Sequence, residues 1–267
     1  MTEQNIHFVS VCDDISKASY LITTASANNI RLTFFVTHAW SGFECKITAL
    51  VRLLQGVRAH DIVCFVDAYD VLVLQNSNTI KERFLEYTCN ILFSSEQVCF
   101  PSCNEEKYDE YYKDNVPLFP CLNSGGFIGY SGALLKMLTS KCARDIQAEC
   151  YNGGDQAFFT NYFLSFHDDE QIQLDTKQLI FQSMCAIDYS TTFTCIGGRI
   201  YNKLTNVYPC ILHFNGFRDN DVKCVRHRVT GIMMPALHVF LTYTQTQYTG
   251  MILYDYPYIE HIYGKTK

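Results

Sequence analysis

The chain has 267 residues, which fits one large domain or two small ones. Hydrophobic residues make up 48% of it, enough for a sizeable core, and the formal net charge of −6 disfavours nucleic acid and anionic membranes as partners. The sequence has no run of 18 or more apolar residues, so we expect no membrane span. Residues 1–5 lack the basic start and apolar stretch of a signal peptide.

The 13 cysteines are scattered, and many of them lie inside apolar segments, where a free cysteine behaves as a small hydrophobe. No Cys-x-x-Cys pair is present, which argues against a zinc ribbon. Cys99 and Cys103 are close in sequence and could form a local disulfide or remain unpaired. We therefore expect mostly reduced thiols and a cytoplasmic or other reducing compartment.

The first 60 residues have the pattern of a βαβ unit. Residues 7–11 and 31–36 are apolar and β-branched, as in strands, and residues 16–28 between them have helical spacing. Such a unit belongs to a parallel sheet in an α/β fold. The sequence contains no Gly-x-Gly-x-x-Gly, which argues against a dinucleotide-binding Rossmann site.

A second helix is expected over residues 44–58, where apolar residues recur on one face. Lys46 lies in its first turn, a place that the helix dipole does not favour for a cation. Two interpretations stay open: a solvated surface lysine, or a lysine in contact with a phosphate or a carboxylate.

Two carboxylates follow the most apolar stretch of the chain. Residues 62–66 predict a strand buried on both faces, and Asp67 and Asp70 come directly after it. Ligands of open α/β sheets bind outside the carboxyl ends of strands, and carboxylate oxygens suit Mg²⁺ or Mn²⁺. An Asp-rich turn without a metal is the alternative.

Further elements alternate up to residue 130. We expect a helix over 79–86, a strand over 90–95 and a long irregular surface segment over 96–120. The next stretch, Cys121 to Tyr130, contains the pair Gly125-Gly126 beside an apolar strand. These glycines permit either a close approach of the backbone to a ligand or a tight turn with a bulge.

The last recognisable elements are helices over 133–142 and 157–164 and a strand that begins at Ile211. Asp155 stands just before the second of these helices, where it could simply be a cap. His213 lies at the end of the strand. Beyond Arg226 the chain is rich in tyrosine, so we divide it into a domain over 1–225 and an extension over 226–267 that packs on the domain or at an oligomer interface.

Taken together and in order, these motifs resemble one family. They are Phe-Val-Asp-Ala-Tyr-Asp at 65–70, Phe-Ser-Ser-Glu at 93–96, Asn-Ser-Gly-Gly-Phe-Ile-Gly at 123–129, Asp-Gln at 155–156 and His-Phe-Asn-Gly at 213–216. Residues 8–216 look like the glycosyltransferase domain of multifunctional procollagen lysyl hydroxylases and related collagen galactosylhydroxylysine glucosyltransferases.

The resemblance implies a GT-A glycosyltransferase fold, a Rossmann-like, mostly parallel sheet flanked by helices that binds a UDP-sugar and Mn²⁺. Asp67 and Asp70 match the metal-binding Asp-x-x-Asp motif, and His213 matches the histidine that completes the metal site. Tyr69 matches the aromatic residue that stacks on uracil. Because Tyr69 lies between two ligands, we expect its ring to lie beside the nucleotide. We also expect the first βα loop, around Val11 and Cys12, to reach the same edge and help hold the uridine.

Other residues of the resemblance concern the sugar and the diphosphate. Lys46 matches a lysine near the nucleotide, and Asn215 and Gly216 match the turn beside the diphosphate. The segment from Asn123 through Gly125 and Gly126 would line the cleft for donor and acceptor. Asp155 is the candidate for the carboxylate that stabilises the sugar cation during transfer.

The chain departs from the family pattern at two points. Asn152-Gly153-Gly154 stands where the family has an aspartate run, which leaves Asp155 alone, and Phe100 stands where the family has a tryptophan. Phenylalanine keeps a stacking surface for a sugar but lacks the indole N–H.

Three functions are compatible with the sequence. The first is a Mn²⁺-dependent retaining transfer of glucose from UDP-glucose to galactosylhydroxylysine of collagen or a collagen-like protein. The second is a GT-A enzyme with another UDP-sugar or acceptor, such as a galactosyltransferase. The third is a non-catalytic module that binds a UDP-sugar or glycan. In each case the chain could form a homodimer.

Overall fold

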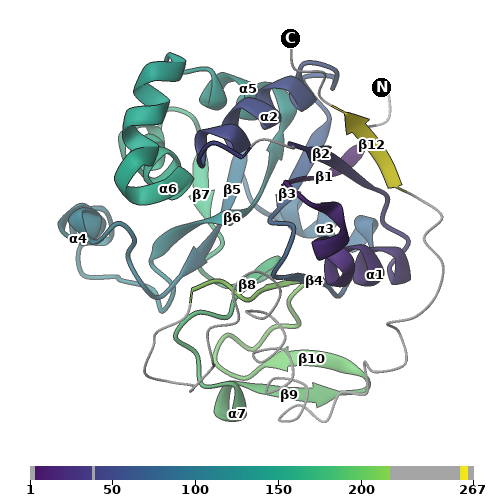
Figure 1. Cartoon of the computed structure of the whole chain (residues 1–267). Helices are drawn as coiled ribbons and strands as arrows, with labels where there is room; N and C mark the ends of the chain where they lie inside the picture. Colours follow the sequence, from purple (N-terminus) through teal and green to yellow (C-terminus); the bar gives the residue numbers. More distant parts are fainter. Residues whose placement is uncertain (1–3, 38–39, 217–258, 264–267) are drawn as a thin grey trace.

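The computed structural model describes residues 4–37, 40–216 and 259–263, which form an α/β protein built around one large sheet (Figure 1). The strand order is β12-β2-β1-β3-β6-β5-β7, and β6 alone runs antiparallel to its neighbours β3 and β5. This confirms the expected α/β class with a mostly parallel central sheet. The strands are β1 Ile6–Cys12, β2 Leu32–Val36, β3 Ile62–Val66, β5 Ile91–Glu96, β6 Cys121–Tyr130, β7 Ile172–Leu174 and β12 Ile259–Tyr263.

Helices cover both faces of this sheet, because alternate residues of each central strand point to opposite sides. On β3, Ile62 and Cys64 pack with one group of helices, whereas Val63 and Phe65 pack with the other. The first group is η1 Ile15–Ala18, α1 Ser19–Ala27 and α3 Ser77–Glu86; the second is α2 Glu44–Leu54, α5 Ser131–Leu138 and α6 Ala143–Phe166.

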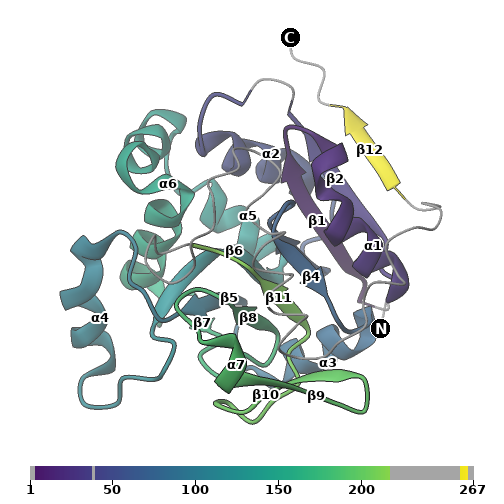
Figure 2. The same cartoon turned by 60° about the horizontal axis from the view of Figure 1, so that its bottom comes forward.

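A smaller sheet lies beside the carboxyl end of β3 (Figure 2). Its order is β4-β11-β8, with bounds Val71–Val73, Ile211–His213 and Phe181–Ser183, and β11 is antiparallel to β4 with His213 opposite Val71. Beyond it lie α7 Tyr189–Thr192 and the hairpin of β9 Phe193–Ile196 and β10 Arg199–Asn202. The residues between β3 and β4 therefore join the two sheets, next to the end of β11.

One expectation about local structure is wrong, and another is incomplete. Residues 96–120 are not one irregular segment, because they contain η2 Ser102–Asn104 and α4 Glu105–Tyr112, whose first turn is acidic and whose Tyr108 is buried. The helix expected over 157–164 is present, but α6 already begins at Ala143, and a kink at Gly154, which has φ 62° and ψ −168°, separates an earlier helical segment that the sequence did not predict.

The C-terminal extension is described only at β12, which pairs in parallel with β2 at the edge of the large sheet. Residues 217–258, with most of the tyrosine-rich stretch, lie outside the described residues, so the boundary at 225 stays a prediction. None of the helices in the described part is long and apolar enough to cross a membrane. Burial raises the pKa of the Cys12 thiol to about 12, in keeping with cysteines that act as small buried hydrophobes.

A buried carboxylate sets the turn that leads into β8. Asp175 is fully buried and accepts hydrogen bonds from the Tyr87 hydroxyl at 2.7 Å and from the backbone N–H groups of Leu179, Ile180 and Phe181 at 2.7–2.9 Å. Burial raises the pKa of Asp175, although these donors oppose the shift. The turn brings the Phe181 ring against Gly126 of β6, so it helps to hold the two sheets together.

We expect Asp175→Ala to lower the free energy of unfolding by about 3 kcal/mol, because it leaves several buried donors without an acceptor. Urea denaturation followed by circular dichroism measures the change. Asp168→Ala is the matched control, since that side chain is 96% exposed, and it should change stability little. Equal stability of the two variants would contradict the role given to Asp175.

Candidate active site

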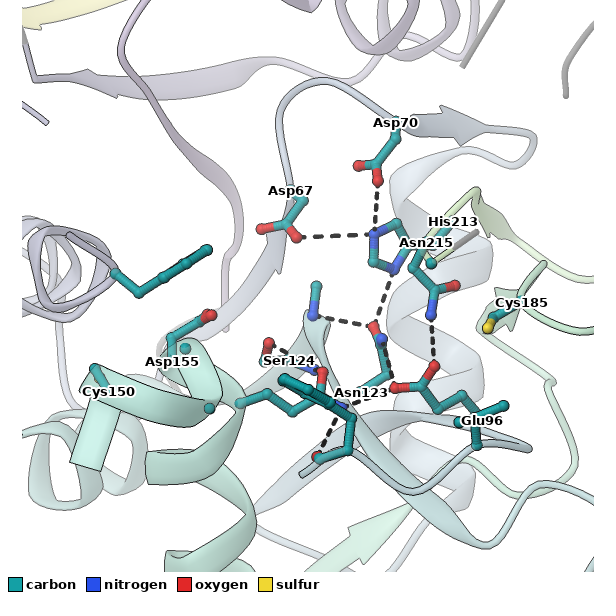
Figure 3. Close-up of a pocket in the computed structure, with 18 of the residues that line it drawn as sticks. Asp67, Asp70, Glu96, Asn123, Ser124, Cys150, Asp155, Cys185, His213 and Asn215 are labelled. Carbon is teal, nitrogen blue, oxygen red and sulfur yellow. Dashed lines mark hydrogen bonds and ion pairs between the residues drawn. The ribbon is translucent and has the colours of Figure 1, made fainter. Parts of the chain in front are cut away.

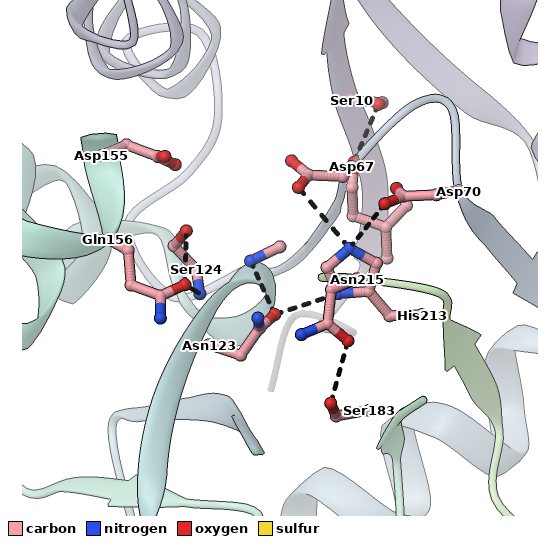
Figure 4. Close-up of polar contacts among 12 residues, drawn as sticks. Ser10, Asp67, Asp70, Asn123, Ser124, Asp155, Gln156, Ser183, His213 and Asn215 are labelled. Atoms are coloured by element: carbon pink, nitrogen blue, oxygen red, sulfur yellow. Dashed lines mark hydrogen bonds and ion pairs between the residues drawn. The ribbon is translucent and has the colours of Figure 1, made fainter. Parts of the chain in front are cut away.

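Three potential metal ligands meet at the junction of the two sheets. Asp67 and Asp70 come from the connection between β3 and β4, and His213 ends β11. His213 Nε2 lies 3.7 Å from Asp67 Oδ2 and 3.3 Å from Asp70 Oδ2, and the three ligand atoms lie within 4.8 Å of one another (Figure 4). The pairing of β11 with β4 explains this proximity, because it places His213 beside Val71 and Asp70.

The ionisation of this group is strongly coupled. Burial favours the neutral form of His213, but the charges of Asp70 and Asp67 outweigh the effect of burial and raise the pKa of the imidazole. Burial likewise opposes ionisation of Asp70, but His213 lowers the pKa of that carboxyl below its ordinary value. For Asp67, burial prevails over Lys46 and His213 and raises the pKa. The site thus brings together negative charge that a divalent cation could neutralise.

A bulge in β6 forms the floor of the site. The pairing with β5 shifts between Phe93 opposite Phe127 and Ser94 opposite Asn123, so residues 124–126 have no partner on β5. Their buried backbone groups bind site residues instead. Ser124 N–H donates to Gln156 Oε1 at 3.2 Å, Ser124 C=O accepts from Lys46 Nζ at 3.0 Å, and Gly125 N–H donates to Asn123 Oδ1 at 3.0 Å.

The two glycines of the bulge give room to rings of the second sheet. A Cβ on Gly125 would come within 1.9 Å of Cε1 of His213, and one on Gly126 within 2.7 Å of the Phe181 ring. Both interpretations of the glycine pair therefore hold in part. The strand bulges without a tight turn, and its backbone makes a close approach to the His213 ring of the same chain.

Lys46 is a buried cation between two carboxylates. Its Nζ lies 2.8 Å from Asp67 Oδ1 and 2.6 Å from Asp155 Oδ2, and with the bond to Ser124 C=O all three of its N–H donors have partners. Burial alone would lower the pKa of Lys46, but Asp155 and Asp67 raise it. Of the two interpretations left open for Lys46, the carboxylate contact is the one that the structure has.

Most of the residues described so far, though not Lys46, line a cavity of about 720 Å³ between α6, the loop after β5 and the second sheet (Figure 3). Asp67, Asp70, His213, Asp155 and Glu96 contribute charge to its wall. The exposed aromatic side chains of Phe43, Phe100 and Tyr151 also border it. Polar groups in the interior and aromatic rings at the margin suit a polar ligand that has an apolar face.

Tyr69 joins the first βα loop to the carboxylate segment. Its hydroxyl accepts hydrogen bonds from the N–H groups of Asp13 and Asp14 at 3.0 Å and donates to the Asp13 carboxylate. The end of β1, with the buried residues Val11 and Cys12, therefore lies at the same edge as Tyr69, as predicted.

The structure thus brings most of the predicted site residues to one place. The residues that line the cavity are Asn123, Gly125, Asp155, Asn215 and Gly216. Behind its wall lie Lys46 and Gly126. The neighbouring loop holds Tyr69, Val11 and Cys12.

Sequence reasoning missed three residues that hold the site together. Glu96 and Gln156 stand in motifs that resemble the family, but no role follows from their spacing. Ser183, at the end of β8, gives no motif at all. The position of Glu96 at a strand end was the available indication, since such positions face the ligand edge of an α/β sheet.

Comparison with known proteins identifies the class. A family model described as "PLOD GT domain" matches residues 36–227, well over half of the chain. The chain therefore belongs to the family of PLOD glycosyltransferase domains. Membership and the observed topology confirm the expected glycosyltransferase fold and an enzyme of the transferase class.

Several relatives are about 30% identical to this chain over the aligned region. An uncharacterized protein R699 of Acanthamoeba polyphaga mimivirus is 32% identical over 174 residues, 64% of this chain and 35% of its own length. The multifunctional procollagen lysine hydroxylase and glycosyltransferase of Caenorhabditis elegans is 30% identical over 218 residues, 73% of this chain and 28% of its own length. The matched region is about a third or less of these relatives.

Solved structures with a related shape include galactosyltransferase LgtC in complex with donor and acceptor sugar analogs. It has a TM-score of 0.49 and 12% identity over 91% of this chain and 99% of that one. Mouse xyloside xylosyltransferase 1 has a TM-score of 0.48 and 14% identity over 79% of this chain and 98% of that one.

We expect Gly125→Ala to displace the His213 ring, because the new Cβ would overlap it, and so to weaken binding of a divalent cation by about 10-fold or more. Calorimetric titration with Mn²⁺ measures the affinity, and thermal unfolding checks the fold. Gly56→Ala is the control, since its nearest neighbour is an atom 3.8 Å away. Unchanged Mn²⁺ affinity in Gly125→Ala would contradict this packing argument.

Proposed function

We propose that this chain is a Mn²⁺-dependent retaining glycosyltransferase that moves glucose from UDP-glucose to galactosylhydroxylysine of collagen or a collagen-like protein. The observation that carries the proposal is the meeting of Asp67, Asp70 and His213 in the wall of a large cavity, in a chain of the PLOD glycosyltransferase family.

The donor set fits the proposed metal. Two carboxylates and one imidazole suit Mn²⁺, and the rest of its coordination shell would be open to phosphate oxygens and water. When bound, such a cation supplies charge neutralisation for a departing UDP group. The role of the chain is to hold Asp67, Asp70 and His213 in one orientation before the substrate arrives.

The donor would extend from this site in two directions. Tyr69 and the loop around Val11 and Cys12 would hold the uridine, since the Tyr69 hydroxyl already ties that loop to the carboxylate segment. Asn215 and Gly216 would lie beside the diphosphate, and the bulge from Asn123 to Gly126 beside the sugar. Lys46 would act from behind the wall, because its three donors bind Asp67, Asp155 and Ser124.

Asp155 is the proposed catalytic carboxylate. It begins the second half of α6, directly after Gly154, and lines the cavity together with the three metal-type ligands. An anion in this place would stabilise positive charge on the anomeric carbon as the bond to UDP breaks. Lys46 Nζ lies 2.6 Å from Asp155 Oδ2, and the Asp155 side chain stands at the N-terminus of the helix segment.

The acceptor is proposed from a relative, and the compartment from the cysteines. One relative is named a multifunctional procollagen lysine hydroxylase and glycosyltransferase, which supports a collagen-like acceptor. A homodimer and a reducing compartment belong to the same proposal, the latter because so many cysteines are buried as thiols.

Release of UDP from a panel of UDP-sugars in Mn²⁺, with and without galactosylhydroxylysine peptide, tests the proposal. We expect UDP-glucose to give the highest rate and the peptide to increase it. Preference for UDP-galactose or another donor would point to a different transfer with the same site. Binding of UDP-sugars without any release of UDP, in every condition, would identify a binding module instead of an enzyme.

Replacing Asp67 or Asp70 by alanine removes one of three proposed ligands and should abolish Mn²⁺-dependent binding of UDP. Calorimetry with UDP, in the presence and absence of Mn²⁺, measures this. Asp109→Ala, at an exposed position on α4, is the control and should bind as the unmodified chain does. UDP affinity in Mn²⁺ that stays the same in the two site variants would rule out this metal site.

Asp155→Asn should lower kcat by about 10²–10³ with little change in donor binding, the pattern of an interaction made only in the transition state. The substitution keeps the shape and removes the charge, and asparagine begins a helix about as well as aspartate. Asp145→Asn, in the exposed first turn of α6, is the control. Near-normal turnover in Asp155→Asn would leave Asp155 only a structural role.

A further inference from the structure

Glu96 is a buried carboxylate, at the end of β5, that binds three side-chain amides. Oε1 accepts from Asn123 Nδ2 at 3.1 Å and from Gln156 Nε2 at 2.8 Å, and Oε2 accepts from Asn215 Nδ2 at 2.7 Å (Figure 3). The residue is 5% exposed. Its partners belong to β6, to α6 and to the segment after β11, so one carboxylate holds three parts of the site.

Each of these amides uses its oxygen for a different contact. Asn215 Oδ1 accepts from Ser183 Oγ at 2.9 Å, and Gln156 Oε1 accepts from Ser124 N–H at 3.2 Å. Asn123 Oδ1 accepts from Gly125 N–H at 3.0 Å and lies 2.9 Å from Nδ1 of His213 (Figure 4). The chain of contacts from Glu96 therefore reaches the histidine through Asn123.

The hydrogen-bond network fixes which way the Asn123 amide points. A backbone N–H can only donate, so the Asn123 atom that faces Gly125 must be the oxygen. A carboxylate can only accept, so the Asn123 atom that faces Glu96 must be the nitrogen. Both neighbours require the same orientation, and it presents an acceptor to Nδ1 of His213.

We infer that Glu96 is a positioning residue which, through Asn123, holds His213 in the tautomer with the proton on Nδ1. The lone pair on Nε2 then faces Asp67 and Asp70, where a divalent cation would bind. The part that concerns the metal rests on the proposed function, whereas the proton on Nδ1 follows from the contacts of Asn123. Outer contacts of this kind orient ligating histidines.

The opposite tautomer satisfies Nε2 but not Nδ1. A proton on Nε2 could be donated to Asp70 Oδ2, 3.3 Å away. With the proton on Nε2, the lone pair of Nδ1 would face the lone pairs of Asn123 Oδ1. Rotation of the amide by half a turn would relieve that contact but would direct the amide N–H groups at Gly125 N–H and the amide oxygen at the Glu96 carboxylate. Each alternative replaces hydrogen bonds of the buried network by repulsive contacts.

Nitrogen NMR of the metal-free chain, with ¹⁵N-labelled histidine, tests the tautomer directly at a pH above the titration of the imidazolium. The spectrum of His213→Asn assigns the signals. We expect the pattern of a protonated Nδ1 and an unprotonated Nε2. A protonated Nε2 in the unmodified chain would overturn the inference, and this result needs no variant of Glu96 to fold.

Two variants of Glu96 distinguish the effect of its hydrogen bonds from the effect of its negative charge. In Glu96→Gln the side-chain carbonyl can still accept hydrogen bonds from Asn123 and Gln156. The new amide nitrogen can donate to the Asn215 oxygen if the Asn215 amide rotates, so that its nitrogen donates to Ser183 Oγ. We expect this variant to keep the Nδ1–H pattern. In Glu96→Ala the Asn123 amide loses one of its two anchors and keeps only the contact with Gly125 N–H, so a mixture of both tautomers should appear.

Calorimetric titration with Mn²⁺ alone gives the second readout. Glu96→Ala should bind about 10–100-fold more weakly and Glu96→Gln close to normally. Normal affinity and an unchanged tautomer in a folded Glu96→Ala would overturn the role of Glu96. If the unmodified chain binds no Mn²⁺, the proposed metal-dependent function fails, while the metal-free spectrum still decides the positioning role.

Discussion

The bulge in β6 is the constraint on which the site depends. At residues 124–126 the strand leaves its partner β5, and the freed backbone groups lie in the interior, where an unpaired N–H or C=O is costly. Lys46, Gln156 and Asn123 supply the missing partners, and Asp67 N–H donates to Gly125 C=O at 2.9 Å. Side chains from separate elements are thus fixed around one stretch of backbone, as a preorganised site requires.

The same stretch explains why a lysine is buried in the first turn of α2. A buried ammonium is unfavourable unless its hydrogen bonds and charge are compensated, and Lys46 meets this condition with Ser124 C=O and two carboxylates. It also links Asp67 of the metal-type cluster to Asp155, since Nζ lies within 2.8 Å of both. A change at Asp67 therefore alters the electrostatic environment of Asp155 without direct contact between them.

The sequence predicts the parts of this arrangement that depend on local pattern. The apolar run before Asp67 predicts β3 and places the carboxylates at its end, as observed. The position of His213 beside them depends on pairing between β4 and β11, some 140 residues apart, which no local pattern encodes. The resemblance supplied it. The inward direction of the Lys46 side chain depends on the bulge in β6, and so do the contacts of Glu96. Residue spacing alone could therefore predict neither feature.

Gly154 shows how an incomplete local prediction can conceal a feature of the candidate site. The Asn-Gly-Gly sequence indicates a break, and α6 is indeed kinked there, at a single residue with positive φ, a conformation that glycine adopts at little cost. The break in direction makes Asp155 the first residue of a new helical segment, with its carboxylate at the positive end of the helix dipole and against Lys46. The aspartate run of the resembled family is absent here, but the kink retains one carboxylate in the cavity. Tyr151 stands exposed at the cavity margin, whereas the two glycines are constrained. A Cβ on Gly153 would come within 2.7 Å of Ala157 Cβ, and Gly154 has a positive φ, so the position of the Asp155 charge depends on both glycines.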